Sequence, residues 1–453
     1  MEQKKIVNGT HNYTDEQNYQ YPTEPAVREH LERFRSLKLG LMMHWAPYTQ
    51  LGLMASWPLC DGDASWSQEQ IDWTDDMEEF KQQYWNLNKT FNPVRFRPDR
   101  WAALAKECGF KYLCFTTKHH DGFCMFNTKT TDYKITAPDC PFSSHKYANI
   151  VKELFHAFRS EGLAISAYFS KPDWHSDAYW HRAFGNAPDR NVNYNIDEHP
   201  ELWEEFVQYT HQQLLELTTD YGKIDALWLD GGWVAPDNLK QDIRLNEIIS
   251  KIRATTQPHL IVCDRTVGGL YENIVTPEQC IPSEPLSIPW EANLTLGRSY
   301  SYFYDDELKP AREVVAMLID IVSKGGNLAL NITPRPDGGL SNEAVYILRQ
   351  LGGWLAKNGD GIYGTSISEC LPNRNIKYTR KGNREYAFYL YGKVPYLQPR
   401  VTLEIPGPVA SVRLLRTGEE VPYCYTEKGI VLFTSGLNRM GMEYADCFEV
   451  VRK

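Results

Sequence analysis

Five short groups of polar residues, each directly after a run of apolar, β-prone residues, constrain the fold of this chain more than any other feature. In a barrel of parallel strands, side chains at the carboxyl ends of the strands converge on one pocket. The repeated pattern therefore predicts an α/β fold with a (β/α)8-like, TIM-type barrel and a site at the carboxyl ends of its strands. The five groups are His44-Trp45, Lys118-His119-His120-Asp121-Gly122, Tyr168-Phe169-Ser170, Asp230-Gly231-Gly232-Trp233 and Asp264-Arg265.

The chain divides into three predicted parts. Residues 1–24 are polar and predict an irregular lead-in. From 25 to 362, strand-like and helical stretches alternate, as repeated βα units do, and predict the catalytic barrel. Short alternating runs from 363 to 453 predict a C-terminal antiparallel β-sandwich. The expected barrel helices include residues 98–108, 148–159, 200–219 and 342–358.

Composition excludes several kinds of partner. The net charge is −10 and no basic stripe is present, which argues against a nucleic-acid partner. No apolar run approaches the length of a membrane span. The first residues lack the apolar core of a secretory signal, so a cytoplasmic location is expected, or a secreted one if a signal has been removed.

Cysteine spacing argues against a bound metal. The ten cysteines contain no CxxC pair and several lie in strand-like runs, which predicts buried thiols rather than a disulfide framework or a zinc site. We therefore expect neither a metal nor a cofactor.

The polar residues of the five groups suit a sugar better than a phosphate. They combine histidines, a tyrosine, an arginine and carboxylates, and the chain holds 13 Trp and 27 Tyr. Aromatic faces stack on the C–H faces of sugars while their edges keep a polar group available. Core packing is the alternative explanation for many of these aromatic residues.

In these motifs the chain resembles the retaining α-L-fucosidases of glycoside hydrolase family 29, over roughly residues 36–365. The resemblance implies a barrel followed by a β-sandwich and an exo-acting hydrolase that removes terminal α-L-fucosyl residues from oligosaccharides or glycoconjugates. The resemblance is compatible with a homo-oligomer. The matching motifs are residues 38–45, 116–123, 168–175, 227–233, 264–265, 322–328, 331–332 and 336–338.

Retaining glycosidases need two carboxyl groups about 5–5.5 Å apart, one as nucleophile and one as acid and then base. Asp230 ends a predicted strand and is followed by two glycines, which suits a nucleophile, although a helix-capping Asp would look similar. The resemblance implies that Asp230 is the nucleophile. For the acid/base we favour Glu278, which follows Arg265 in a predicted loop, over Glu291 in the Trp290-Glu291 pair. Glu284 and Glu272 are less favoured.

The resemblance also implies a set of substrate-binding residues. The histidines would hydrogen-bond sugar hydroxyls, Tyr168 would lie near the nucleophile, and Arg265 would contact the sugar. Trp57 matches a tryptophan of the family, and other aromatic residues would form an apolar wall against the C6 methyl group of fucose. For each residue core packing is the alternative. The set comprises His44, Trp57, His119, His120, Tyr168, Trp228, Arg265, Trp290 and Tyr300.

Two departures from the family leave alternatives open. Ser56 stands where many relatives carry a glutamate that contacts sugar hydroxyls, so either Asp61 or Asp63 replaces it or the glycone site accepts a different hydroxyl pattern. Residues 292–295 also differ from the corresponding segment of the family, which contains a cysteine, and this difference affects the expected aglycone preference. The competing hypotheses are a catalytically silent fucose-binding protein and a related glycosidase of altered glycone specificity.

Overall fold

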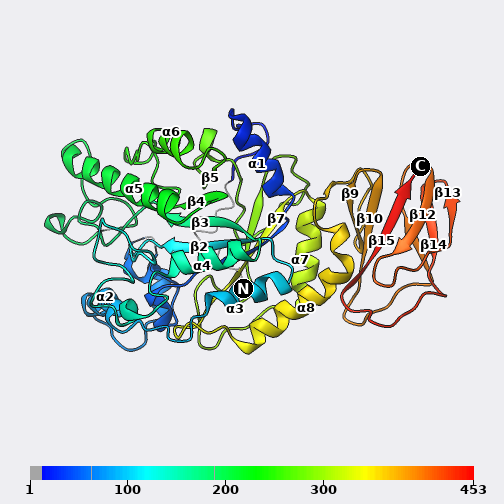
Figure 1. Ribbon diagram of the computed structural model, residues 1–453, viewed down its shortest axis with the longest axis horizontal. Helices are drawn as coiled ribbons and strands as arrows, with labels where there is room; N and C mark the ends of the chain where they lie inside the picture. Colours follow the sequence, from blue (N-terminus) through cyan, green and yellow to red (C-terminus); the bar gives the residue numbers. More distant parts are fainter. Residues whose placement is uncertain (1–12, 63, 188) are drawn as a thin grey trace.

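The computed structural model describes residues 13–453 except 63 and 188 (Figure 1). Its first part is a curled sheet of seven parallel strands in the order β5-β4-β3-β2-β1-β7-β6. Nearly every strand residue is buried, as in sheets that are covered on both faces. The strands are β1 (Leu39–Met43), β2 (Tyr112–Lys118), β3 (Ala164–Ser170), β4 (Ala226–Asp230), β5 (Ile261–Asp264), β6 (Glu291–Thr295) and β7 (Asn327–Ile332).

Residues 273–279 close the gap between the two edge strands of this sheet. At the β5 edge, Asn273 N–H donates to the Val262 carbonyl at 2.8 Å. At the β6 edge, Val275 and Glu278 form parallel bridges with Trp290 and Asn293. The segment therefore takes the place of an eighth strand, and the predicted (β/α)8-like barrel is confirmed with one irregular member.

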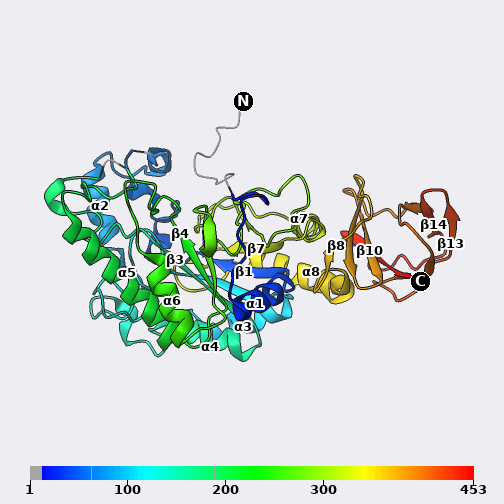
Figure 2. The same cartoon turned by 90° about the horizontal axis from the view of Figure 1, so that it is seen from above.

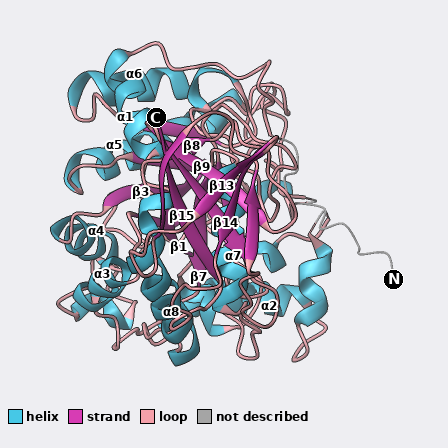
Figure 3. Cartoon of the chain, turned by 90° about the vertical axis from the view of Figure 1, so that its right-hand side faces the viewer, coloured by secondary structure: helices cyan, strands magenta, loops and turns pink. Residues whose placement is uncertain are grey.

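Helices surround the barrel, as Figures 1 and 3 show. The four helices expected from the sequence are present with ends shifted by no more than two residues. Gly109 and Gly162, just past α3 and α4, have φ angles of 88° and 80°, a left-handed conformation that favours glycine at a helix end. The helices are α1 (Pro25–Arg35), α2 (Met77–Trp85), α3 (Pro98–Glu107), α4 (Ile150–Ser160), α5 (Pro200–Asp220), α6 (Leu245–Thr255), α7 (Ala311–Ser323) and α8 (Asn342–Asn358).

The C-terminal part consists of two antiparallel sheets, of five strands (β12-β15-β10-β9-β8) and three strands (β11-β14-β13), so the predicted β-sandwich is confirmed. Figure 2 shows it beside the barrel, next to α8. Its core lies between the sheets and includes Leu403 and Leu432. The strands are β8 (Ser366–Ile367), β9 (Ile376–Lys381), β10 (Arg384–Leu390), β11 (Arg400–Leu403), β12 (Val409–Leu414), β13 (Tyr423–Thr426), β14 (Gly429–Phe433) and β15 (Ala445–Arg452).

Of the predicted lead-in, residues 1–12 lie outside the described residues. Residues 13–24 contain only turns and bends before α1 begins. They pack against the closing segment, where the Tyr19 hydroxyl donates to the Asn273 carbonyl at 2.7 Å. None of the helices that the structure describes is long and apolar enough to cross a membrane.

Candidate active site

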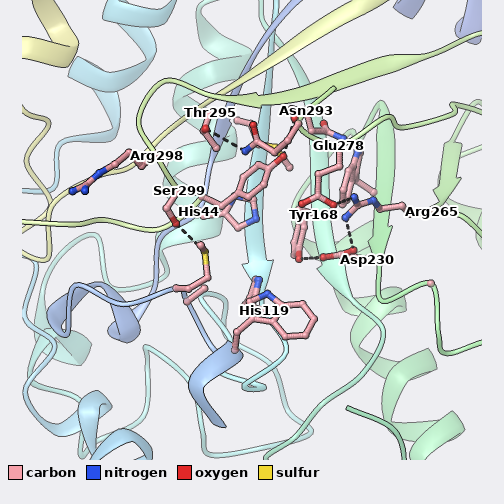
Figure 4. A pocket seen from close by; sticks show the side chains of 18 of the residues that line it. His44, His119, Tyr168, Asp230, Arg265, Glu278, Asn293, Thr295, Arg298 and Ser299 are labelled. Carbon is pink, nitrogen blue, oxygen red and sulfur yellow. Dashed lines mark hydrogen bonds and ion pairs between the residues drawn. The ribbon is translucent and has the colours of Figure 1, made fainter. Parts of the chain in front are cut away.

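A pocket of about 450 Å³ lies at the carboxyl ends of the barrel strands (Figure 4). Among the residues that the structure describes, Asp230 and Glu278 provide the only carboxyl groups in its wall. The predicted site residues that line it are His44, Trp57, His119, Tyr168, Trp228, Asp230, Arg265, Glu278 and Tyr300. His120, Glu291 and Trp290 are not among the lining residues.

One guanidinium group connects the two carboxyl groups of the pocket. Asp230 ends β4, Arg265 directly follows β5, and Glu278 lies on the closing segment. Arg265 Nη1 donates to Asp230 Oδ1 at 3.0 Å, and Nη2 donates to Glu278 Oε2. Both carboxylates therefore lie within hydrogen-bonding reach of one guanidinium group.

Asp230 is held in its ionised form. Burial opposes ionisation, but the Arg265 guanidinium, His120 and the Tyr168 hydroxyl together hold the pKa of Asp230 well below its ordinary value. The Tyr168 hydroxyl donates to Asp230 Oδ2. Burial and the nearby Asp230 raise the pKa of Tyr168 well above 10, so the phenol keeps this proton. The site thus presents an ionised carboxylate at neutral pH.

His44 is a neutral hydrogen-bonding group in the pocket wall. Burial lowers its pKa to about 4. Its Nδ1 lies 2.8 Å from Asn331 Oδ1, and Asn331 Nδ2 donates to the Tyr300 carbonyl at 3.1 Å. Because the Asn331 oxygen faces His44, Nδ1 carries the proton and Nε2 is an acceptor. That tautomer suits a sugar hydroxyl as the donor.

Ser56 supports His119 from behind the pocket. Its hydroxyl is fully buried and hydrogen-bonds His119 Nδ1, while burial holds the pKa of His119 well below its ordinary value. Asp61 does not line the pocket and instead pairs with Lys81 at 2.6 Å, so it does not replace the family glutamate. Asp63, the other proposed replacement, lies outside the described residues.

His120 packs behind Asp230 instead of lining the pocket. Its Nδ1 lies 2.5 Å from Ser170 Oγ, and its Nε2 lies 3.8 Å from Asp230 Oδ2. Burial lowers its pKa to about 3. The ring centroid lies 5.0 Å from Trp57 and 5.1 Å from Trp233, so the neutral ring supports the tryptophans of the pocket.

A buried ion pair fixes the loop that carries both histidines. Lys118 Nζ lies 3.1 Å from Asp173 Oδ2, and both side chains are almost fully buried. Gly122 has a φ of 78°, and a Cβ there would lie 2.1 Å from Asp173 Oδ1. A glycine is therefore required for this close approach.

Glu291 lies below the floor of the pocket. It accepts hydrogen bonds from Tyr112 Oη at 2.5 Å and from Trp228 Nε1 at 3.2 Å. Burial raises its pKa to about 7. Trp228 in turn stacks on Tyr168, with ring centroids 5.1 Å apart. Trp290 also points away from the pocket: it packs against Gly326, and its indole N–H donates to the Lys324 carbonyl.

The less favoured acid candidates lie outside the pocket wall. Glu272 accepts hydrogen bonds from Thr14 and from the Thr266 backbone, and Glu284 is exposed. Neither is among the lining residues.

No sequence motif pointed to Arg190 as a lining residue, and residues 292–295, which include Asn293, were related only to aglycone preference. The Arg190 guanidinium lies 4.9 Å from the Trp57 ring and 5.0 Å from the Trp233 ring, which joins two tryptophans at the pocket wall. Arg190 lies in a long loop after β3 and belongs to none of the motifs. Trp233, by contrast, belongs to the sequence motif that contains Asp230, so the sequence did point to this residue.

Among the described residues, two groups of side chains have the spacing of metal ligands: His119 with His120 and Asp230, and His30 with Asp225 and His259. In the first group the Asp230 oxygens already accept from Arg265 and Tyr168, and the guanidinium would repel a cation. In the second, Asp225 pairs with His30 and with Lys223 at 3.0 Å. Both donor sets are better explained as hydrogen-bonded ion pairs.

Comparison with known proteins identifies similar chains. Residues 6–360 match the family model described as alpha-L-fucosidase. Human plasma α-L-fucosidase is 26% identical over 382 residues, which cover 80% of this chain and 76% of that protein. The structure of α-L-fucosidase isoenzyme 1 from Paenibacillus thiaminolyticus is similar with a TM-score of 0.76 and 28% identity, and covers 94% of this chain and 100% of that one. The Thermotoga maritima α-fucosidase in complex with fucose has a TM-score of 0.73 and 26% identity, and covers 95% and 100%.

Proposed function

Because this chain belongs to the α-L-fucosidase family, we propose that it hydrolyses terminal α-L-fucosyl residues of oligosaccharides or glycoconjugates with retention of configuration. The observation that carries this proposal is the contact of Asp230 and Glu278 with one Arg265 guanidinium in a pocket. Two close carboxyl groups with different surroundings are what double displacement requires.

In the first step Asp230 attacks the anomeric carbon of the fucosyl group. Glu278, protonated, gives its proton to the glycosidic oxygen as the bond from that oxygen to the anomeric carbon breaks. The aglycone leaves as an alcohol, and a fucosyl ester on Asp230 remains. The low pKa of Asp230 keeps the nucleophile ionised for this step.

In the second step Glu278, now a carboxylate, takes a proton from water while the water oxygen attacks the anomeric carbon. The ester bond to Asp230 breaks and the carboxylate is regenerated. Two inversions at the same carbon give net retention. A sugar hydroxyl in place of water would give transfer instead of hydrolysis.

Neutral hydrogen-bonding groups support binding of the sugar. His44 offers an acceptor at Nε2, and His119 lies beside it with its ring 5.7 Å away. Trp228 and Tyr300 offer apolar surface in the same pocket, which suits the C6 methyl group of fucose. The Ser56 contact with His119 keeps this histidine in place without a glutamate.

A matched set of variants tests both carboxyl roles. Wild type, Asp230→Ala, Glu278→Ala and Glu291→Ala are assayed on an activated aryl α-L-fucoside with and without azide. We expect β-fucosyl azide from Asp230→Ala by direct displacement, and α-fucosyl azide from Glu278→Ala through the covalent intermediate. Glu291→Ala should form no azide product, because Glu291 lies below the floor of the pocket.

Two results would contradict the proposal. Formation of α-fucosyl azide by Glu291→Ala and not by Glu278→Ala would transfer the acid/base role to Glu291. A wild-type protein that cleaves neither the aryl fucoside nor fucosylated oligosaccharides, yet binds fucose, would support the silent binding protein.

A further inference from the structure

We propose that Asn293 is a positioning residue for Glu278: its side-chain amide holds the Glu278 carboxyl when that carboxyl leaves Arg265 to protonate the glycosidic oxygen. The inference rests on the proposed acid/base role of Glu278. It assigns a function to a residue that no motif of the sequence singles out.

Asn293 lies beside Glu278 on the same wall of the pocket. Asn293 N–H donates to the Pro277 carbonyl at 3.1 Å, and Gln279 N–H donates to the Asn293 carbonyl at 2.9 Å. These bonds make Glu278 and Asn293 register partners, and register partners project their side chains to the same face of a sheet. Both residues line the pocket and lie close together in Figure 4.

The Asn293 side chain is a buried amide in the pocket wall. Among the residues that the structure describes, neither Nδ2 nor Oδ1 of Asn293 has a hydrogen-bond partner, and the residue is only 1% exposed. A buried amide without partners destabilises a fold, so native structures nearly always satisfy such groups. An unsatisfied amide in the wall of a substrate pocket therefore indicates a partner that is present at another stage of the reaction.

Glu278 has to change its contacts during that reaction. Here it accepts a hydrogen bond from the Arg265 guanidinium. To serve as the acid, Glu278 has to carry a proton, and the loss of its negative charge weakens this contact. The carboxyl is then able to turn to the leaving group. Its register partner then offers a neutral replacement: Asn293 Nδ2 donates to one carboxyl oxygen while the other, protonated oxygen faces the glycosidic bond.

Asn293 falls in residues 292–295, where the sequence departs from the version typical of the family it resembles. The backbone N–H and carbonyl of Asn293 are already hydrogen-bonded, and the carbonyl also accepts from Tyr300 Oη at 2.8 Å. Only the side chain is therefore available for the proposed role.

Asn293→Leu tests the inference, because leucine has a similar size and lacks both amide atoms. Aryl α-L-fucosides with leaving groups from dinitrophenol to phenol serve as substrates. A dinitrophenolate leaves with little help from an acid, whereas a phenolate needs protonation. We expect kcat/KM on the phenyl substrate to fall about 100-fold, within the range of general acid catalysis, and to change little on the dinitrophenyl substrate. The melting temperature should be unchanged or higher, because an unsatisfied buried amide has been removed.

Asn293→Asp provides a second variant of the same size. A second negative charge at this position opposes loss of the proton that the acid delivers, so the basic limb of the kcat profile should move to higher pH. A side chain at position 293 that does not face the Glu278 carboxyl would not move this limb. An unchanged profile in a folded, active Asn293→Asp protein would count against the inference.

Thr276→Val is the matched control. The Thr276 hydroxyl is also buried and without a partner in the described part of the chain, and it lies on the same segment as Glu278, but it does not line the pocket. This variant should keep the leaving-group dependence of the wild type.

Glu278→Ala separates the two possible failures. Suppose that Glu278→Ala steepens the leaving-group dependence. If Asn293→Leu then behaves like wild type, or if Asn293→Leu loses activity equally on every substrate, the inference about Asn293 is wrong and the acid role of Glu278 stands. If Glu278→Ala does not steepen the dependence, the acid role itself fails and the inference fails with it.

Discussion

Whether a carboxyl group can act on a substrate depends on the layer of the barrel in which it lies. Glu278 and Glu291 both follow Arg265 in the chain, and the sequence left the choice between them open. Glu278 is paired with Asn293, whereas Glu291 lies two residues earlier on β6, one layer deeper. The Glu278 side chain is 16% exposed, while Glu291 is 1% exposed and bonded to Tyr112. The layer depends on strand register, which residue types alone do not determine.

Glu291→Gln should change how stability depends on pH. Burial raises the folded-state pKa of Glu291 to about 7, above its ordinary value of 4.5. Folding therefore takes up a proton between these values, and the wild type loses stability as pH rises through this window. Glutamine mimics the protonated group and avoids this loss. Relative to wild type, the variant should gain about 2 kcal/mol between pH 5 and pH 7.5.

Denaturant unfolding at several pH values measures this difference. Glu284→Gln, at an exposed glutamate, is the control and should follow the wild type at every pH. Parallel stability curves for wild type and Glu291→Gln would contradict the prediction.

At the scale of elements, regular helices could be predicted from the sequence and the closing segment could not. The helix over Pro98–Glu107 has a proline at its start, apolar residues at helical spacing and a glycine after its end, which are local signals. Residues 273–279 lack such a pattern. Their backbone groups bond to Val262 on β5, to Asn293 on β6 and to Pro289 just before β6. The element that carries Glu278 is therefore defined by its neighbours.

The same contrast applies to the two adjacent histidines. The motif correctly placed both at the end of β2, but successive residues of an extended chain point in opposite directions. His119 consequently lines the pocket, and His120 packs behind Asp230. Trp290 was likewise expected in the apolar wall, but its side chain packs against Gly326. Its neighbour Glu291 is the residue of this pair that faces the barrel interior.

The Lys118–Asp173 pair connects the ends of β2 and β3, and its loss should be costly. Asp173→Ala would leave a buried ammonium group without a carboxylate partner, so we expect the free energy of unfolding to fall by about 3–5 kcal/mol. Replacing both residues by apolar ones, as in Lys118→Met with Asp173→Leu, should recover part of this loss. Chemical denaturation measures all three proteins.

An exposed ion pair of the same kind serves as the control. Lys106 and Glu161 lie 2.9 Å apart on the surface, and Glu161→Ala should cost less than about 1 kcal/mol. Equal losses of unfolding free energy in Asp173→Ala and Glu161→Ala would show that burial does not make the Lys118–Asp173 pair more important for stability.

At the scale of the whole molecule, one strand of the sandwich contributes to two cores, that of the barrel and that of the sandwich. Strand β10 uses both faces: Tyr386 and Phe388 belong to the core cluster of the barrel, and Ala387 and Tyr389 belong to that of the sandwich. The alternating aromatic residues of this strand predicted burial and a sandwich. They did not reveal that α8 would cover the outer face of the five-stranded sheet, because that contact depends on the surface of the barrel and not on the sequence of the strand.

Trp354→Ala tests the packing of α8 against the sandwich. Trp354 on α8 is fully buried, its indole N–H donates to the Ala445 carbonyl of β15 at 2.8 Å, and its ring lies 6.2 Å from Phe388. Because this contact couples the two parts, we expect wild type to unfold in one calorimetric transition. The variant should lose about 3–5 kcal/mol, the usual cost of removing a buried tryptophan. Tyr346→Ala, at a side chain on α8 that is 64% exposed, should leave the transition almost unchanged. A separate, earlier transition of the sandwich in the wild type would show that the parts unfold independently and that the contact at Trp354 does not couple them.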